Sequence, residues 1–303
     1  MQREIHAVTG AFGYSGLHIA RLLLERGARV RSLTGHPDRP DPFGGRVEVR
    51  PFHFEDPSQM RAALADVKVL YNTYWVRFAH GGTTHARAVE NSRRLFQAAS
   101  EAGVERVVHV SITNPSLDSP LPYFEGKAQV EEALASSGLS HAILRPAVFF
   151  GGRDVLINNI AWLLRRLPVF GFAPGPYGLQ PIHVDDLARL AVEQGAGREN
   201  VVLDAVGPET LGFEELVRLV RRAVGSRALV TPVPPWLLLL ASRLLRPVVG
   251  DVVLTPDEVA GLTANLLVSR GPPTGRTRFT EWLGKHAGEL GRTWANELTR
   301  HFR

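Results

Sequence analysis

Tyr123 and Lys127 are the residues best placed to do chemistry, because a helix would bring both side chains onto one face. The chain contains 32 Arg but only three Lys, and one of those Lys follows a Tyr at this helical spacing. An ammonium beside a phenol lowers the pKa of the phenol, and the resulting phenolate can transfer protons near neutral pH. The pair predicts acid–base chemistry on Tyr123. The alternative interpretation is a solvent-exposed helix on which Lys127 has no functional role.

A glycine-rich turn precedes this pair in the chain. Gly10, Gly13 and Gly16 follow the apolar strand pattern at 5–8 and lead into an amphipathic helix pattern at 17–25. Glycines at this spacing let the backbone turn sharply and let a pyrophosphate approach the amides at the start of the helix. The turn predicts dinucleotide binding; the alternative is a simple glycine turn.

The elements that must position these residues alternate between strand and helix along the chain. After the first helix we expect strands at 28–33, 47–49, 67–72, 107–112, 140–144 and 201–205. Helices are expected at 58–64, 85–102 and 184–193, and a further helix that carries Tyr123 and Lys127 should extend to residue 135. Strands separated by helices of this length predict an α/β fold with a doubly wound parallel sheet, and a ligand at the carboxyl ends of its strands.

Two domains are expected. Residues 1–150 form the dinucleotide-binding domain, and residues 151–303 form a smaller, mostly helical substrate lobe. Within that second part, 183–206 returns one helix and one strand to the sheet. The irregular segment before it is rich in aromatic residues and predicts an apolar pocket, formed by Phe149, Phe150, Asn158, Trp162, Phe170, Phe172 and Tyr177.

Composition excludes several classes of function. The absence of Cys removes disulfides, zinc–thiolate sites and cysteine nucleophiles, and the spacing of the eleven His suggests no metal site. The net charge is +5, but the Arg residues are scattered, so we expect no nucleic-acid partner. No signal-peptide pattern opens the sequence, which predicts a cytoplasmic protein.

The most apolar stretch of the chain spans 233–245. Arg243 and Arg246 interrupt it well before the roughly 20 residues that a membrane span requires, so no integral membrane segment is expected. The stretch can serve as a surface for a protein partner or for a membrane. Leu-rich helices usually bury themselves, so we predict a core helix and no peripheral membrane contact.

Taken together, these motifs resemble the short-chain dehydrogenase/reductase superfamily in its extended and atypical branches, with their epimerase/dehydratase-like Rossmann fold. The likeness rests on segments 9–16, 109–113, 123–127, 144–151 and 181–186. It is greatest to the atypical group that contains quinone- and lignan-type reductases, dinucleotide-sensing regulators and a nucleotide-binding accessory subunit of respiratory complex I. The resemblance implies a chain that binds NAD or NADP. It also implies a monomer or homodimer that acts on a small-molecule substrate.

The resemblance also implies roles for individual residues. Tyr123 is then the proton donor or acceptor, and Lys127 binds the nicotinamide ribose and lowers the pKa of Tyr123. A hydroxyl at the end of the preceding strand orients the substrate oxygen, and either Thr113 or Ser111 can supply it. Strand register favours Thr113, and the alternative for either hydroxyl is a local bond to the backbone.

The end of the second strand decides between NAD and NADP. An acid usually holds the ribose 2′-hydroxyl there in NAD enzymes, whereas this chain offers Thr34, His36 and Arg39, which suit a phosphate. We therefore favour NADP(H), although a small shift in register would return Asp38 to the site. The other residues expected at the cofactor are Gly10, Phe12, Gly13, Tyr14, Gly16, His53, Phe54, Asn72 and Lys127.

Three functions compete on this basis. We favour an NAD(P)-dependent oxidoreductase that passes hydride to or from a small carbonyl or alcohol. A nucleotide-sugar epimerase or dehydratase is the first alternative; only Arg165 and Arg166 in the insert could hold its diphosphate. A dinucleotide-binding sensor or accessory subunit without turnover is the second, and retention of both Tyr123 and Lys127 argues against it.

Overall fold

The computed structural model describes residues 4–301, which form two compact units. The first unit comprises the chain up to Pro146 together with Val184–Ala205. The second comprises Ala147–His183 and the chain from Val206 onward.

The first unit is built on a seven-stranded parallel sheet with the strand order β11-β6-β5-β4-β1-β2-β3. Its strands are β1 (Ile5–Thr9), β2 (Arg29–Thr34), β3 (Val47–Pro51), β4 (Val67–Asn72), β5 (Arg106–Val110), β6 (Ser140–Pro146) and β11 (Val201–Ala205). The central strands are almost entirely buried, as expected where helices cover both faces of a parallel sheet. The predicted α/β, doubly wound fold is confirmed.

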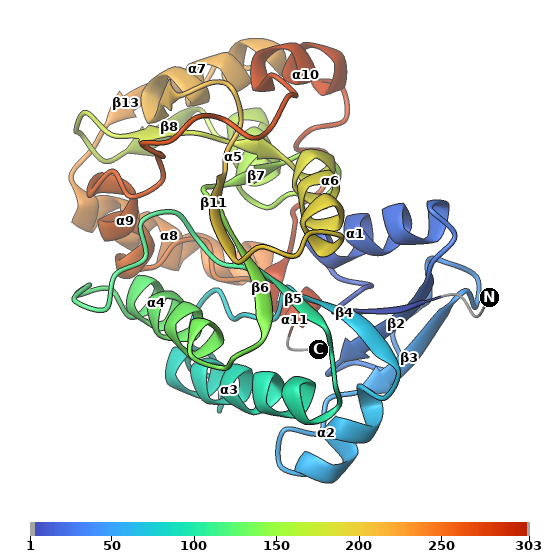
Figure 1. Ribbon diagram of the computed structural model, residues 1–303. Helices are drawn as coiled ribbons and strands as arrows, with labels where there is room; N and C mark the ends of the chain where they lie inside the picture. The colour runs from blue at the N-terminus through green and yellow to red at the C-terminus, as the bar shows by residue number, and fades with distance from the viewer. Residues whose placement is uncertain (1–3, 302–303) are drawn as a thin grey trace. The chain divides into compact units, whose positions relative to one another are not determined.

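Two layers of helices cover this sheet (Figure 1). The helices are α1 (Tyr14–Glu25), α2 (Pro57–Ala63), α3 (His85–Glu101), α4 (Pro122–Ala135) and α6 (Val184–Gly195). α1 packs against α6, and α3 packs against both α2 and α4. α4 begins with Pro122, whose fixed φ suits the first helical position, and this start places Tyr123 in the first turn.

The second unit surrounds its own apolar core with short elements. The strands are β7 (Phe149–Phe150), β8 (Val169–Phe172), β9 (Gly178–Leu179), β10 (Ile182–His183), β12 (Leu211–Gly212) and β13 (Leu229–Pro232). The helices are α5 (Leu156–Arg166), α7 (Phe213–Ala223), α8 (Pro235–Val249), α9 (Pro256–Thr263), α10 (Phe279–His286) and α11 (Glu297–His301). Phe150, Phe170, Phe172 and Tyr177, four of the residues predicted to form an aromatic pocket, belong to this core.

The prediction that the apolar stretch at 233–245 forms a core helix is wrong. It does form α8, but Ser242 is the helix's one buried residue. Leu238 and Leu239 pack on the core, whereas Trp236 and Leu244 are 65% and 69% exposed. The two-stranded β8–β13 ribbon beneath α8 can cover only one side of a helix. Within residues 4–301 no helix combines the length and apolar character required to cross a bilayer.

Candidate functional site

The glycine turn connects β1 to α1 as expected and has the shape of a phosphate cradle. Gly10 has a φ of +65°, which only glycine adopts at little cost, and its amide donates to Leu33 O at 2.8 Å. A Cβ on Gly16 would lie 2.3 Å from Gly10 O, so no larger residue fits there. Among residues 4–301 no side chain caps the start of α1 at Gly13, and the first turn of α1 carries no acid. The amides at that end suit an anionic group.

Hydrogen bonds between strand ends hold this turn in place. Thr73 N donates to Thr9 Oγ1 at 2.6 Å, Thr73 Oγ1 donates to Thr9 O at 2.6 Å, and Ala11 N donates to Ser32 Oγ at 3.2 Å. Asn72, the residue predicted to lie beside the cofactor ribose, is fully buried and accepts from Thr9 Oγ1. Its amide faces His109 Nδ1 at 3.1 Å, so its side chain positions the strand ends instead of offering a surface.

Thr34 is the last residue of β2, and His36 and Arg39 lie in the turn that follows it. The amide of His36 donates to Thr34 Oγ1 at 3.0 Å, and the amide of Arg39 donates to His36 O at 3.3 Å. The nearby carboxylate of Asp38 is exposed to solvent. The turn therefore gathers a hydroxyl, an imidazole and a guanidinium at the carboxyl end of β2.

Aromatic rings gather after β3, in the segment that holds the predicted cofactor residues His53 and Phe54. Phe52 and Phe54 stack with ring centroids 4.6 Å apart, and both meet the ring of Tyr74. Asn91 Nδ2 on α3 donates to the hydroxyl of Tyr74 at 2.9 Å and fixes that ring. His53 lies between the two Phe residues and is partly exposed. The cluster gives the region after β3 an apolar surface.

The Tyr/Lys pair lies on α4, next to the end of β5. The Lys127 side chain is buried, and its Nζ donates to Val110 O at 2.9 Å. Desolvation lowers the pKa of Lys127 to about 7, and the carboxylate of Glu131 on the next turn partly offsets this effect. Glu131 also pairs with Arg145 at 2.5 Å. Burial therefore brings the pKa of Lys127 from the alkaline range toward neutral pH.

Trp75 connects the two members of the pair. Lys127 Nζ lies 4.6 Å from the centroid of the Trp75 ring, close enough for a cation–π interaction. Tyr123 meets the same ring edge-on at 5.8 Å, and His85 stacks on it at 5.8 Å with an interplanar angle of 9°. A Cβ on Gly126 would lie 2.9 Å from Trp75 Cη2, so glycine makes room for the indole.

The two candidate hydroxyls follow β5 in extended backbone. The amide of Ser111 donates to Leu144 O at 2.7 Å, and that of Thr113 donates to Pro146 O at 2.9 Å. Both side chains are buried. Within the described residues, Ser111 Oγ has no hydrogen-bond partner. A buried hydroxyl without a partner is costly, so Ser111 has unused capacity for a ligand.

Sequence reasoning did not find the contact between Trp75 and Lys127. No sequence pattern predicts that the ring of Trp75 lies over the ammonium of Lys127. The two residues lie 52 positions apart, and the one local signal is the glycine next to Lys127, where a side chain would collide with the indole.

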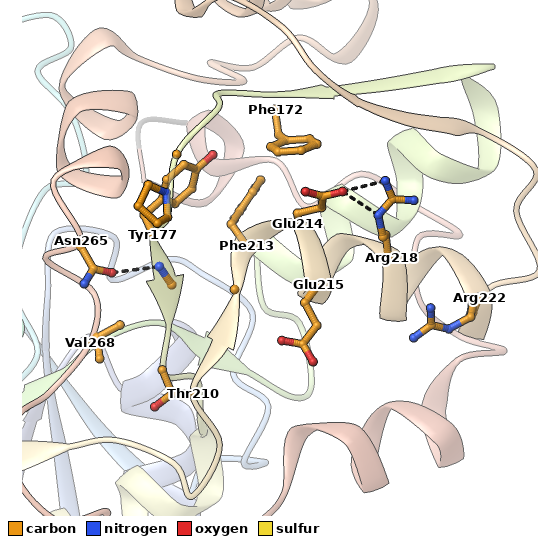
Figure 2. Close-up of a pocket in the computed structure, with 14 residues that line it drawn as sticks. Phe172, Tyr177, Thr210, Phe213, Glu214, Glu215, Arg218, Arg222, Asn265 and Val268 are labelled. Atoms are coloured by element: carbon orange, nitrogen blue, oxygen red, sulfur yellow. Dashed lines mark hydrogen bonds and ion pairs between the residues drawn. The ribbon is translucent and has the colours of Figure 1, made fainter.

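The second unit contains a cavity of about 670 Å³ (Figure 2). Phe172, Tyr177 and Phe213 are among the residues that line it. Glu214 and Arg218 of α7 also line it and form an ion pair at 2.6 Å. Of the residues predicted to form an aromatic pocket, Phe172 and Tyr177 line this cavity.

Arg165 and Arg166 are the two residues of the insert that could hold the diphosphate of a nucleotide sugar according to the sequence. The Arg165 guanidinium donates to the carbonyls of Leu290, Ala287 and Val224, at 2.8, 2.9 and 3.2 Å. Arg166 donates to two further carbonyls at 2.8 Å and stacks over Trp162. Both side chains tie segments of the second unit together, which makes them poor ligands for a diphosphate. Among residues 4–301 no group of three or more His, Asp or Glu is arranged to hold a metal ion.

Comparison with known proteins agrees with this geometry. Residues 10–157 match the protein family described as NAD(P)H-binding. The mitochondrial NADH dehydrogenase (ubiquinone) 1 alpha subcomplex subunit 9 of Arabidopsis thaliana is 24% identical over 291 residues, which cover 88% of this chain and 71% of that protein.

Two solved structures show the same fold. The NADPH-dependent quinone oxidoreductase of Escherichia coli, complexed with NADPH, superposes with a TM-score of 0.72 at 20% identity, covering 93% of this chain and 99% of that one. A nucleoside-diphosphate-sugar epimerase from Staphylococcus aureus superposes with a TM-score of 0.71 at 17% identity, with the same coverage. Proteins of different activity thus share this fold, and the site must decide the function.

Proposed function

We propose that this chain, which is an NAD(P)-binding Rossmann protein of the extended, epimerase/dehydratase-like short-chain dehydrogenase/reductase type, is an NAD(P)-dependent oxidoreductase. The observation that carries the proposal is the bond from Lys127 Nζ to Val110 O, at 2.9 Å. This bond holds the helix that bears Tyr123 against the strand end that continues into Ser111. A phenol, an amine and a buried hydroxyl are thereby gathered at one edge of a dinucleotide-binding sheet.

Each of these groups has a chemical task in the proposed reaction. The bound cofactor supplies a nicotinamide ring that can donate or accept hydride. Tyr123 gives a proton to the substrate oxygen during reduction and removes it during oxidation. Ser111 Oγ, buried and without a partner, donates a hydrogen bond that orients this oxygen. Thr113 is the alternative hydroxyl two residues further along.

Lys127 adjusts the acidity of Tyr123 through its own charge. With its pKa lowered to about 7, Lys127 gains and loses a proton in the pH range in which the enzyme would work. The face of Trp75 favours the cationic form, and the buried surroundings favour the neutral form. A change that brings charge or water to Lys127 therefore changes the proton affinity of the neighbouring phenol.

NADP(H) is the cofactor that the turn after β2 suits better. Thr34, His36 and Arg39 supply hydrogen-bond donors and positive charge for a 2′-phosphate, and Asp38 lies in solvent. Titration calorimetry with NADPH and NADH tests this preference. We expect NADPH to bind at least tenfold more tightly, equal to about 1.4 kcal/mol. Arg39→Gln should reduce that ratio without weakening NADH binding, and equal affinities in the unchanged protein would contradict the preference.

Turnover is tested by mixing NADPH-loaded protein with a panel of quinones, aldehydes and ketones. Tyr123→Phe should lower kcat at least a hundredfold for any substrate found, because the proton donor is lost. Its affinity for NADPH should stay within twofold of the unchanged protein. A Tyr123→Phe variant that keeps full activity would contradict the role given to the phenol.

A second function is favoured by one feature of the same site. The Lys127 amine is fully buried and bonded to the protein backbone, so it presents little surface to a ribose. A non-catalytic NAD(P)H-binding subunit needs no such contact, and the likeness to a subunit of NADH dehydrogenase points in the same direction. This function predicts tight NADPH binding, no turnover with any panel member, and no effect of Tyr123→Phe.

A further inference from the structure

α8 exposes a continuous apolar face to solvent. Trp236, Leu240, Leu244 and Val248 follow one another at intervals of four and therefore form one stripe, with Leu237 beside it. These five side chains are between 38% and 71% exposed. They make up five of the nine most exposed large apolar side chains in the described part of the chain, and all five belong to one helix of 15 residues.

Packing on the opposite side fixes the rotation of α8. Leu238 and Leu239 pack against the core of the second unit, and Ser242 Oγ donates to Leu254 O, beyond the end of the helix, at 3.4 Å. A Cβ on Gly171 of β8 would lie 3.2 Å from Leu238 Cδ2, so the helix sits close on that strand. The stripe therefore cannot turn inward without breaking these contacts.

The charges on α8 all have one sign. Arg243 and Arg246 are exposed, and the helix contains no Asp or Glu. Arg243 lies one turn from Leu240 and borders the apolar stripe. The acid that follows the helix, Asp251, is fully buried and accepts from Trp294 Nε1 at 3.0 Å, so its carboxylate is turned to the protein.

We propose that α8 docks flat on an anionic lipid bilayer. A helix of about 22 Å that is apolar on one side and basic at its border matches interfacial helices, which bury the apolar side at the headgroup boundary. The indole of Trp236 suits that boundary, because one edge is apolar and its N–H can bond to a headgroup. Four aliphatic side chains offer a protein partner no hydrogen bond, whereas the two guanidiniums complement lipid phosphates.

Vesicle flotation with the full chain tests this proposal. We expect the protein to float with vesicles of phosphatidylcholine containing about one third phosphatidylglycerol, and not with pure phosphatidylcholine. Arg243→Gln with Arg246→Gln should weaken binding roughly 30-fold, since each basic residue near an anionic surface contributes about fivefold. Leu240→Gln with Leu244→Gln should weaken it at least about tenfold, because both side chains leave the apolar phase.

Matched variants separate the surface from general effects of charge or apolarity. Arg21→Gln with Arg26→Gln removes two exposed arginines, one in α1 and one at its C-cap. Leu117→Gln with Val202→Gln removes two exposed apolar side chains. Both control pairs should float as the unchanged protein does. Thermal unfolding and NADPH affinity should be unchanged in the α8 variants, which keeps loss of folding apart from loss of docking.

Three results would overturn the proposal. The unchanged protein could fail to float with anionic vesicles at low salt. A control pair could weaken flotation as much as the α8 pairs do. Light scattering could find a dimer, in the absence of lipid, that Leu240→Gln with Leu244→Gln dissociates, which would make a second copy of the chain the occupant of this face. None of these results bears on nucleotide binding or turnover, so the proposed function stands or falls separately.

Discussion

Replacing Lys127 with Met should flatten the pH dependence of stability between about pH 7.5 and 9.5. In the folded protein the pKa of Lys127 is about 7, whereas the unfolded chain returns it to 10.5. Between these values the unfolded chain binds one more proton than the folded protein does. Stability therefore rises with pH across this window and is lost again as pH falls toward 7.

The magnitude follows from the burial of the amine. One proton gives a slope of about 1.4 kcal/mol per pH unit, so the unfolding free energy should gain about 3 kcal/mol over two pH units. Below pH 7 the full penalty amounts to about 5 kcal/mol at most. Lys127→Met removes that penalty but leaves Val110 O without its hydrogen bond, at a cost of about 1 kcal/mol. The variant should thus be the more stable protein at pH 7.

Lysine labelling gives a direct assay of the same property. Selective ¹³Cε labelling yields three lysine resonances, from Lys68, Lys127 and Lys285. The resonance that is missing from the spectrum of Lys127→Met is that of Lys127. We expect that resonance to titrate near pH 7. The hydrogen bond to Glu4 raises the pKa of Lys68, so the Lys68 resonance should titrate at higher pH than that of a free lysine and serves as a comparison. Glu131→Gln should move the Lys127 midpoint lower, because Glu131 favours the charged amine.

Urea unfolding of the cofactor-free protein at constant ionic strength measures the slope. The window ends near pH 9.5, because burial raises the pKa values of Tyr71 and Tyr74, and their titration then acts in the opposite direction. Equal slopes in the unchanged protein and in Lys127→Met would refute the reasoning. A Lys127 resonance that titrates above pH 9 would refute it as well, and would restore a permanent positive charge beside Tyr123.

Three further substitutions test the site. Gly16→Ala would place a Cβ 2.3 Å from Gly10 O, so urea unfolding should show a loss of about 1–3 kcal/mol in the unfolding free energy. Calorimetry should show NADPH binding weakened at least tenfold, and an unchanged affinity would contradict a role of this turn in binding phosphate. Ser111→Ala removes a buried hydroxyl that has no hydrogen-bond partner within the described residues. The unfolding free energy should therefore change by less than about 0.5 kcal/mol, while kcat falls at least tenfold. A loss of stability without a loss of turnover would give this hydroxyl a structural role. Gly126→Ala would push against Trp75 Cη2 at 2.9 Å and should cost about 1 kcal/mol, with a changed near-ultraviolet circular dichroism spectrum; an unchanged spectrum would show that the indole does not move.

The sheet and the glycine turn could be predicted from the sequence because local physics specifies them. Strands covered on both faces appear as short apolar runs, and helices between them appear as amphipathic stretches. The turn is specified by sterics: a side chain at Gly16 would collide with Gly10 O, and this requirement is visible in the residue types themselves. The residues at the end of β2 could likewise be read directly from the sequence, which has Thr34 there and no acid.

The surroundings of Lys127 and the exposure of α8 could not be predicted in the same way. The position of Trp75 over Lys127 depends on how the chain after β4 passes α4, which no local pattern records. The apolar residues of α8 occupy both of its faces, a pattern that indicates burial wherever enough structure exists to cover them. How much of the helix the β8–β13 ribbon covers depends on the size of that ribbon, and its size is a property of the fold.

Burial of Lys127 also separates the two candidate functions of the Tyr/Lys centre. A catalyst gains from an amine that titrates near neutral pH only if turnover changes the surroundings of that amine, so that its charge and the acidity of Tyr123 change together. An inert scaffold gains nothing from a buried amine, because an apolar residue of the same length would fill the space at lower cost. Under the proposed oxidoreductase function, the amine of Lys127 beneath Trp75 takes part in proton transfer, whereas the non-catalytic function gives this buried amine no role.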